Sequence, residues 1–507
     1  NETVHRISLM DNKKFLSIFC FLIHFTFVLG QKKIELLNAD SLLFDQQFGE
    51  MQRLKGHVFF QQKDVFMKSD SAWFYEKENR LKAFGRVHIY QKDSFDLFGN
   101  YLEYDGNDEN AIVKGNVELS DEDMTLRTES IIYDIPNKTA FYLQDGHIND
   151  NENDLISKTG KYFSRTKRFS FKNNVVLTNP KYKMTSDTLD YFTSNKTAYF
   201  YGPTYIKSKE NTIYCNAGWY NTKTEESQFS KGAWIQGKEN KLVADSLVYN
   251  RQTGIGKAFR DIILSDSQNN VKIFGAYAVY NQLQKKTTIT INPLAIKIQK
   301  SDTLFLIADT LIDQTDTSAK RAVRAFSNAR FMNLDIQGKA DSIIYQVDDS
   351  TMTLYKKPIL WTDSNQLSAD TIFIFQNSQG IDYMILNANS FITSKENDLV
   401  FNQIKGEKIK ALFIKSELAK VFVINKGESL YYVKEEDSTY SGVNKINCEK
   451  MTISIDSSKV KNILFLSKPK GTFYPIEELS LEKSRLQGFS WLYMLKPKRK
   501  AFILPNN

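Results

Sequence analysis

The feature that most constrains this 507-residue chain is a repeat of about 30 residues that runs through most of its length. Twelve anchor positions recur at steps of 29 to 33 residues, and most of them are Asp, Asn or Glu. Such regular spacing is typical of stacked repeat architectures, in which each unit buries its apolar face against its neighbours. The anchors are Asp40, Asp70, Asn100, Glu129, Lys158, Asp187, Asn216, Asp245, Ala276, Asp309, Asp341 and Asp370.

Two columns of side chains keep a fixed distance from these anchors. The residue three positions before the anchor is apolar in eleven of the twelve units, with Gly338 as the exception. The residue four positions after the anchor is aromatic in ten units, although only 13% of the chain is aromatic. This aromatic column consists of Phe44, Phe74, Tyr104, Tyr133, Tyr162, Tyr191, Tyr220, Tyr249, Tyr280 and Tyr345, and its two exceptions are Asp313 and Ile374.

Apolar and polar residues alternate on both sides of each anchor, which predicts strands with one buried face. The apolar positions change parity at the anchor, so an unbroken strand could not keep one face inward. A bulge or corner at the anchor would restore the inward face, and Asp or Asn suits such a bend. A Gly-x-Val motif, as in Gly56-His57-Val58 and Gly115-Asn116-Val117, follows several anchors by about half a repeat.

We therefore predict an elongated all-β fold, a stack of short antiparallel strands forming a β-helix or β-jelly roll. A propeller would usually repeat at 40 residues or more, and helical patterning is scarce between residues 34 and 385. We expect a first β-jelly-roll domain over residues 31–200 and a second region, continuous with it, over 201–385. Residues 386–507 are expected to be a C-terminal cap or docking region, in which Glu407 and Glu449 are doubtful further anchors.

Residues 10–30 have the pattern of a secretory signal peptide. Lys13 and Lys14 precede an apolar run from Phe15 to Leu29, and Val28 and Gly30 suit a cleavage before Gln31. The alternative is a membrane anchor, but the run is shorter than the roughly 20 residues that a spanning helix needs. The remaining cysteines, Cys215 and Cys448, could form a disulfide in an oxidising compartment or stay as buried free thiols.

One unit of the repeat reads Gly115-Asn116-Val117-Glu118-Leu119 and continues from Met124 to Tyr133 as apolar-x-Leu-x-Thr-Glu followed by Ile and Tyr. This motif, repeated over residues 34–385, resembles the OstA-like family, which includes the periplasmic lipopolysaccharide-transport protein LptA and the N-terminal domain of LptD. The resemblance implies a periplasmic protein, associated in some members with the outer membrane, that binds and carries lipopolysaccharide. It also implies edge-strand pairing with further Lpt-type bridge components, with an outer-membrane barrel component, or with a second copy as a homo-oligomer.

The same resemblance implies an open β-jelly roll whose interior shelters the acyl chains of lipid A during outer-membrane assembly. An acyl chain needs a dry trough, in which each buried methylene contributes about 0.8 kcal/mol. The alternative is that the same residues fill a solid core. The candidate lipid-binding residues are Val58, Phe60, Met67, Val87, Ile89, Leu97, Val117, Leu119, Met124 and Leu126.

The sequence favours a non-enzymatic protein without cofactor or metal. His57, His88 and His147 fall on different rungs of the predicted stack, and no nucleotide-binding loop or Gly-x-Ser-x-Gly motif is present. A net charge of +8 is mild, and export argues against a nucleic-acid partner for the basic C-terminal run. Two alternatives remain: a structural or adhesive secreted β-solenoid, and a carbohydrate-processing β-helix enzyme, which would need clustered acidic residues.

Overall fold

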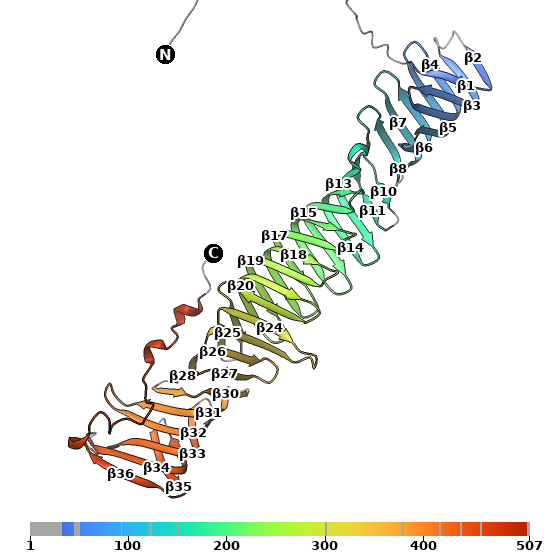
Figure 1. Ribbon diagram of the computed structural model, residues 1–507. Coiled ribbons are helices and arrows are strands. Elements are labelled where there is room, and N and C mark those ends of the chain that lie inside the picture. The colour runs from blue at the N-terminus through green and yellow to red at the C-terminus, as the bar shows by residue number, and fades with distance from the viewer. Residues whose placement is uncertain are drawn as a thin grey trace, which may run out of the picture.

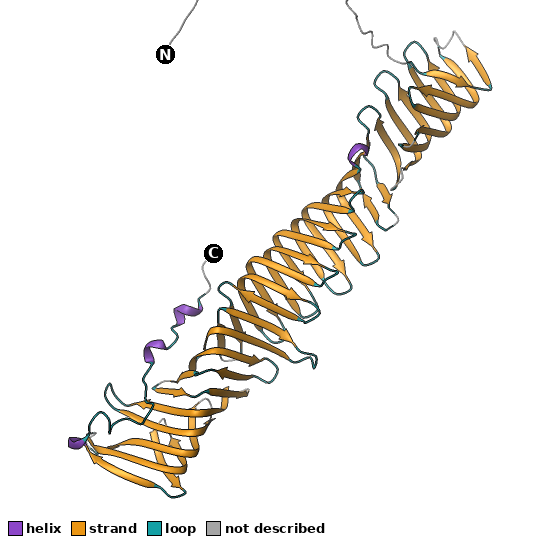
Figure 2. Ribbon diagram, in the orientation of Figure 1, coloured by secondary structure: helices purple, strands orange, loops and turns teal. Residues whose placement is uncertain are grey.

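A computed structural model confirms the elongated all-β fold: 72% of the chain is strand and 3% is helix (Figure 2). The structure describes residues 33–44, 51–92, 94–120, 124–150, 152–299, 302–362, 364–377, 380–414, 417–436, 439–456 and 459–503. The predicted signal segment, residues 10–30, lies outside the described residues. Figure 1 shows a rod in which the strands lie across the long axis and follow one another in chain order.

The first part of the rod is built from antiparallel strands, most of them about 11 residues long. These strands are β1 (Glu35–Asn38), β2 (Ser41–Phe44), β3 (Gln52–Gln62), β4 (Val65–Tyr75), β5 (Arg80–Gln91), β6 (Phe95–Asp105), β7 (Asn110–Ser120), β8 (Thr125–Asp134), β9 (Thr139–Tyr142), β10 (Gly146–Asn149), β11 (Asp154–Ser157), β12 (Thr159–Phe163), β13 (Arg168–Asn179) and β14 (Tyr182–Phe192). At three places two short strands take the place of one long strand and pair with the same long neighbour: β1 with β2, β9 with β10, and β11 with β12.

The middle of the rod continues the same pattern. Its strands are β15 (Thr197–Ser208), β16 (Thr212–Asn221), β17 (Glu226–Gln236), β18 (Asn240–Asn250), β19 (Ile255–Asp266), β20 (Val271–Asn281), β21 (Lys286–Thr290), β22 (Leu294–Ile298), β23 (Thr303–Ile307), β24 (Thr310–Thr315), β25 (Arg321–Met332) and β26 (Ile336–Gln346). Residues 200 and 201 both lie within β15, so the backbone of the two expected regions is continuous here.

The last part contains the longest strands. They are β27 (Thr351–Tyr355), β28 (Ile359–Thr362), β29 (Asn365–Ser368), β30 (Thr371–Asn377), β31 (Gly380–Lys395), β32 (Phe401–Ile414), β33 (Glu417–Lys434), β34 (Tyr440–Asp456), β35 (Lys459–Leu466) and β36 (Lys470–Pro475). Four short 3-10 helices lie in the described residues: η2 (Ser164–Thr166), η3 (Ile476–Glu478), η4 (Tyr493–Leu495) and η5 (Arg499–Phe502).

Each long strand bends at a corner. At the corner, one strand of a pair has a two-residue bulge, and the neighbouring strand has a single anchor residue opposite it. Gly56 and His57 both have positive φ, +75° and +44°, and they stand opposite the single residue Asp70 of β4. Gly85 and Arg86 of β5 face the same Asp70 from its other side. An extra residue in the ladder turns the strand and lets apolar residues on both sides of the corner point inward. The corner predicted at the anchors is therefore present, but the extra residue of each bulge belongs to the neighbouring strand, opposite the anchor.

The same corners recur beyond residue 385. Ala388 and Asn389 of β31 stand opposite Glu407 of β32, and Asn425 and Lys426 of β33 stand opposite Glu449 of β34. The two doubtful anchors thus occupy corner positions. The strand pattern continues to Pro475, and the cap or docking role of residues 386–507 stays a prediction.

The two halves of the bent strands form two sheets that face each other across the interior. One apolar core runs between them from Ile34 to Ile453. The corners close one side of this interior, and the hairpin turns form two rims along the other side. The first rim contains the turns after Gln62, Asn149, Ser208 and Asp266, and the second rim contains the turns after Asp105, Phe192, Asn250 and Thr315.

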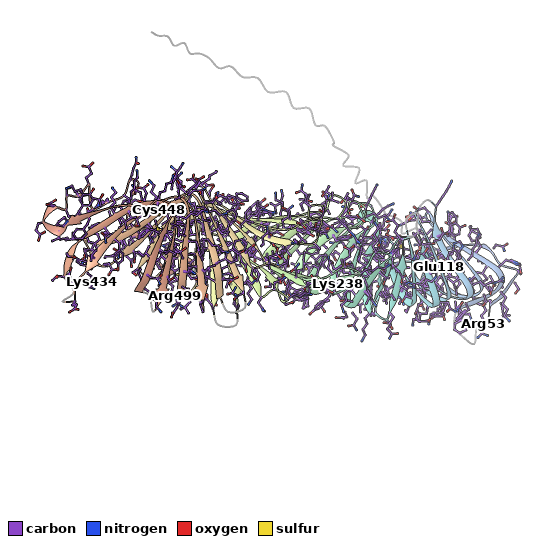
Figure 3. All side chains as sticks on the ribbon, turned by 90° about the horizontal axis from the view of Figure 1, so that it is seen from below. Arg53, Glu118, Lys238, Lys434, Cys448 and Arg499 are labelled. Carbon is purple, nitrogen blue, oxygen red and sulfur yellow. The ribbon has the colours of Figure 1, made fainter. Side chains whose placement is uncertain are left out.

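Residues 476–503 fold back along the outside of the rod (Figure 1). Leu486 is 2% exposed in a small second core with Phe391 and Tyr432, and the ring of Phe502 reaches Phe305 in β23, 6.2 Å between centroids. Figure 3 shows Arg499 of this tail beside the same body. The tail therefore spans the outer face of the sheet from its last strands back to β23.

Two buried glutamines hold the backbone of this tail. The side-chain amide of Gln366 donates to the Ser490 carbonyl and accepts from the Leu492 N–H, both at 2.7 Å. Gln403 donates to the Ser484 carbonyl at 3.0 Å, and its oxygen accepts from the Leu486 N–H at 2.8 Å. Each amide thus replaces the donor and acceptor that a neighbouring strand would supply.

Replacing both glutamines, Gln366→Ala with Gln403→Ala, removes the four hydrogen bonds that hold the tail, each contributing about 1 kcal/mol. We expect faster hydrogen exchange in residues 476–503 and unchanged exchange in β3–β8, as measured by mass spectrometry. The exposed turn residue Gln284 offers a matched control, Gln284→Ala. Wild-type protection of the tail in the double variant would contradict this account of its attachment.

Candidate functional site

The ten residues predicted to bind lipid all point into the interior near the N-terminal end of the rod. Each of them is at most 4% exposed and belongs to the continuous core. The structure therefore brings them together, but as parts of a packed interior rather than as the lining of a cavity. Their contact with lipid stays a prediction.

A cavity of about 470 Å³ opens between the rims farther along the rod, between β14 and β25. Its floor is apolar, and several of the inward side chains there are only partly buried, in contrast to those of the N-terminal strands. The volume is within the range of small-molecule sites. The apolar lining includes Ile206, Ile213, Phe229, Ile235, Leu242 and Leu264.

Small inward side chains line part of this cavity. Opposite Tyr191, strand β13 places Phe169 inward, whereas β19 places Gly256 opposite the equivalent Tyr280. Ser227 takes the same position opposite Tyr249. Further along β19 and β20, Ala258 and Ala278 line the cavity as well. Small residues therefore accompany the groove but do not open the interior by themselves, because Ala111 and Ala140 stand opposite Tyr133 where the mouth is closed.

The opening between the two rims is the mouth of the interior. Outside the groove, contacts between the rims close this mouth. Tyr104 donates a hydrogen bond to Gln62 across the mouth at 2.7 Å. Farther along, the rings of Phe95 and Tyr133 pack with centroids 4.5 Å apart, and those of Tyr182 and Tyr220 pack at 5.0 Å. The last of these contacts marks the N-terminal end of the open groove, because both rings also line the cavity.

A buried carboxylate strengthens the closure just before the groove. Asp150, on the first rim, is 4% exposed and accepts hydrogen bonds from Tyr191 and Asn153. Lys196 of the second rim approaches it at 3.2 Å. Burial acts to raise the pKa of Asp150, but the hydrogen bonds from Tyr191 and Asn153 and the charge of Lys196 outweigh it and lower the pKa.

The mouth of the groove itself is polar and carries both signs of charge. Arg251 and Lys285 line the second-rim side, and Glu210 lines the first-rim side. Burial raises the pKa of Tyr220 to about 12, and Glu225 adds to the rise while Arg251 opposes it. Tyr280 of the aromatic column is 36% exposed here, whereas Tyr133 is 1% exposed where the mouth is closed. An apolar floor below a polar mouth suits an amphiphile.

The other sequence candidates stay apart. His57 and His88 pair on the surface with Asp40 and Asp96, at 2.9 and 2.7 Å. Among the residues that the structure describes, no group of three or more His, Cys, Asp or Glu is placed to hold a metal ion.

The two cysteines are free and buried, Cys215 in β16 and Cys448 in β34, so the disulfide is not formed. Burial raises the pKa of the Cys215 thiol to about 12.

Sequence reasoning missed the groove, because it followed the most regular units of the repeat and not the later units that differ from them. The available signal was the run of small residues at inward positions, Ser227, Gly256, Ala258 and Ala278.

No helix in the described part of the chain is long and apolar enough to cross a membrane.

Fold and groove together define an elongated β-jelly roll that encloses an apolar interior and opens laterally near its middle. Residues 31–187 match the family model of OstA-like proteins, and residues 262–380 match that of the LptA/LptD N-terminal domain, described as a lipopolysaccharide-transport protein. The two matches together span more than half of the chain. The chain therefore belongs to the OstA-like family of lipopolysaccharide-transport proteins, as its repeat motif indicated.

Among solved structures, the chain is similar to LptH of Pseudomonas aeruginosa, the LptA-homologous periplasmic component of its lipopolysaccharide-transport device. The identity is 11%, the match covers 28% of this chain and 80% of that chain, and the TM-score is 0.14. A search of curated proteins finds no match.

The lowered pKa of Asp150 predicts a pH-dependent closure. A carboxyl group with a depressed folded-state pKa contributes stability above its unfolded pKa of about 3.9 and loses it as the pH falls through the folded value. We expect Asp150→Asn to melt at a lower temperature than the wild type at pH 7, by a loss of roughly 1–3 kcal/mol. The difference should shrink as the pH falls below about 4.

Thermal unfolding followed by circular dichroism over this pH range measures the effect. The control is Asp108→Asn, which neutralises an exposed aspartate on the second rim. A constant difference between wild type and Asp150→Asn from pH 7 to pH 3 would show that the charge of Asp150 does not stabilise the closure.

Proposed function

We propose that this protein is a non-enzymatic periplasmic carrier of lipopolysaccharide. It shelters the acyl chains of lipid A in the groove between β14 and β25 and so contributes to outer-membrane assembly. The observation that carries the proposal is the open apolar groove between Ile206 and Leu264 in a chain of the lipopolysaccharide-transport family. Export through the signal segment at residues 10–30 belongs to the same proposal.

The shape of the groove supports an amphiphile as its occupant. Acyl chains transferred onto the partly buried Ile213, Ile235 and Leu242 would cover apolar surface that is now accessible, at about 25 cal/mol per Å². Phosphorylated sugars would remain at the mouth, where Arg251 and Lys285 offer positive charge. The N-terminal residues from Val58 to Leu126 join the path only if the rims above them separate.

The two ends of the rod supply surfaces for partners. At the N-terminal end, β1 and β2 pair only with β3 among the described strands, and Leu42 and Phe44 are about half exposed. At the other end, β35 pairs only with β34 in that part of the chain, and Leu464 is 56% exposed. Unpaired apolar edges favour strand addition. We propose that they join Lpt-type bridge and barrel components or a second copy of this chain.

A structural or adhesive β-solenoid remains the second candidate, and a specific observation favours it. Its interior should be filled, and the interior is filled from β3 to the closure at Tyr182 and Tyr220. The groove distinguishes the two functions, because a purely structural rod has no use for partly exposed leucines that face inward.

A photo-crosslinking amino acid at Leu242, inside the groove, should capture lipopolysaccharide in cells and be detected as a shifted band with antibody to the lipid. The matched control is Val243, the next residue of β18, which points to the opposite face of the sheet. Capture at Leu97, in the packed N-terminal interior, should be weaker than at Leu242. Equal capture at Val243 and Leu242, or none at either, would refute the carrier function.

A further inference from the structure

The C-terminal end of the groove is closed by charged side chains. Arg321, the first residue of β25 on the second rim, contacts Asp266 at the end of β19 on the first rim. Its Nε and Nη2 atoms also donate to the two carboxylate oxygens of Asp313, at 2.7 and 2.9 Å. Arg321 is 8% exposed and Asp266 is 6% exposed. One guanidinium therefore ties both rims together through two carboxylates.

The position of this triad within the repeat is informative. Asp313 is one of the two exceptions in the aromatic column, where ten other units place Phe or Tyr. Asp313 and Arg321 both line the groove, so the triad forms its end wall. The N-terminal end of the same groove is closed instead by the rings of Tyr182 and Tyr220.

Stability alone does not explain three charges at this point. Burying a carboxylate or a guanidinium costs several kcal/mol, and apolar residues of similar volume usually stabilise a protein as well or better. The turn that carries Asp266 is already fixed by hydrogen bonds from Asn269 and Gln268 to the same carboxylate. A charge pair across the mouth differs from an aromatic pair in that its partners regain solvation when they separate.

We propose that Asp266, Arg321 and Asp313 form a latch that controls the passage of acyl chains from the groove into the interior of the C-terminal strands. The proposal rests on the carrier function proposed above. With the latch closed, the rims are tied at β19 and β25 and the lipid is held in the groove. With the latch open, the groove extends past β25 toward the core around Leu354, which is fully buried in the closed state. Lys297 of the first rim, which donates a hydrogen bond to Tyr345 of the second rim at 2.7 Å, is the next contact between the rims on this path.

The test uses the full chain with purified lipopolysaccharide and a photo-crosslinker at either Leu242 or Leu354. The variant Arg321→Gln should raise the ratio of capture at Leu354 to capture at Leu242 about five-fold or more. Its control is Lys181→Gln, which removes the rim contact between Lys181 and Glu225 on the N-terminal side of the groove. That change should leave capture at Leu354 as in the wild type.

A second variant keeps the rims tied. Asp266→Cys with Arg321→Cys, bridged by a short bismaleimide, should retain capture at Leu242 and lose capture at Leu354. The native Cys215 and Cys448 are buried and are replaced by serine in this background. This variant decides the question even if Arg321→Gln does not fold.

The outcomes separate the latch from the carrier function. Absence of capture at Leu242 in the wild type would overturn the carrier function itself. Capture at Leu242 together with equal capture at Leu354 in the wild-type, Arg321→Gln and bridged proteins would overturn the latch alone.

Discussion

The rest of the structure depends on the corner at each anchor, where two residues with positive φ face one residue of the neighbouring strand. Without this bulge, the period-two alternation would turn the apolar residues outward on one side of the anchor. With it, Met67 and Ala72 of β4 both reach the interior on either side of Asp70, although a spacing of five would put them on opposite faces of an unbroken strand. The corner thus converts a simple strand pattern into two facing sheets.

Given the corners, the state of the interior is decided by side-chain volume and by contacts between the rims. Phe169 fills the space that Gly256 leaves open, and Tyr104 bonds to Gln62 where Tyr280 has only the groove beside it. A filled section and an open section can therefore alternate along one continuous fold. No change of topology is needed, because the same antiparallel strand pairing runs through both sections.

The repeat allowed much of this fold to be predicted from the sequence. Periodicity revealed the strands, and the parity change at the anchors revealed the corners, because both follow from local geometry. The groove was not found, because the small residues that line it, such as Ser227 and Gly256, do not stand out from Ala111 and Ala140 at the same position of closed units. The fold of residues 476–503 was also beyond reach, since Gln366 and Gln403 lie more than 80 residues away from the backbone they hold.

If this protein carries lipid as proposed, its largely packed interior implies a particular kind of transport. An acyl chain cannot slide past Val87 or Leu97 while these side chains fill the core, so it must replace their contacts with its own. Such an exchange changes the buried apolar area little, so its free-energy cost comes from separating the two rims. Aromatic pairs, the Asp150 cluster and the Arg321 triad then set the cost of opening at successive points along the rod, so the rims rather than the apolar floor would control where the lipid rests.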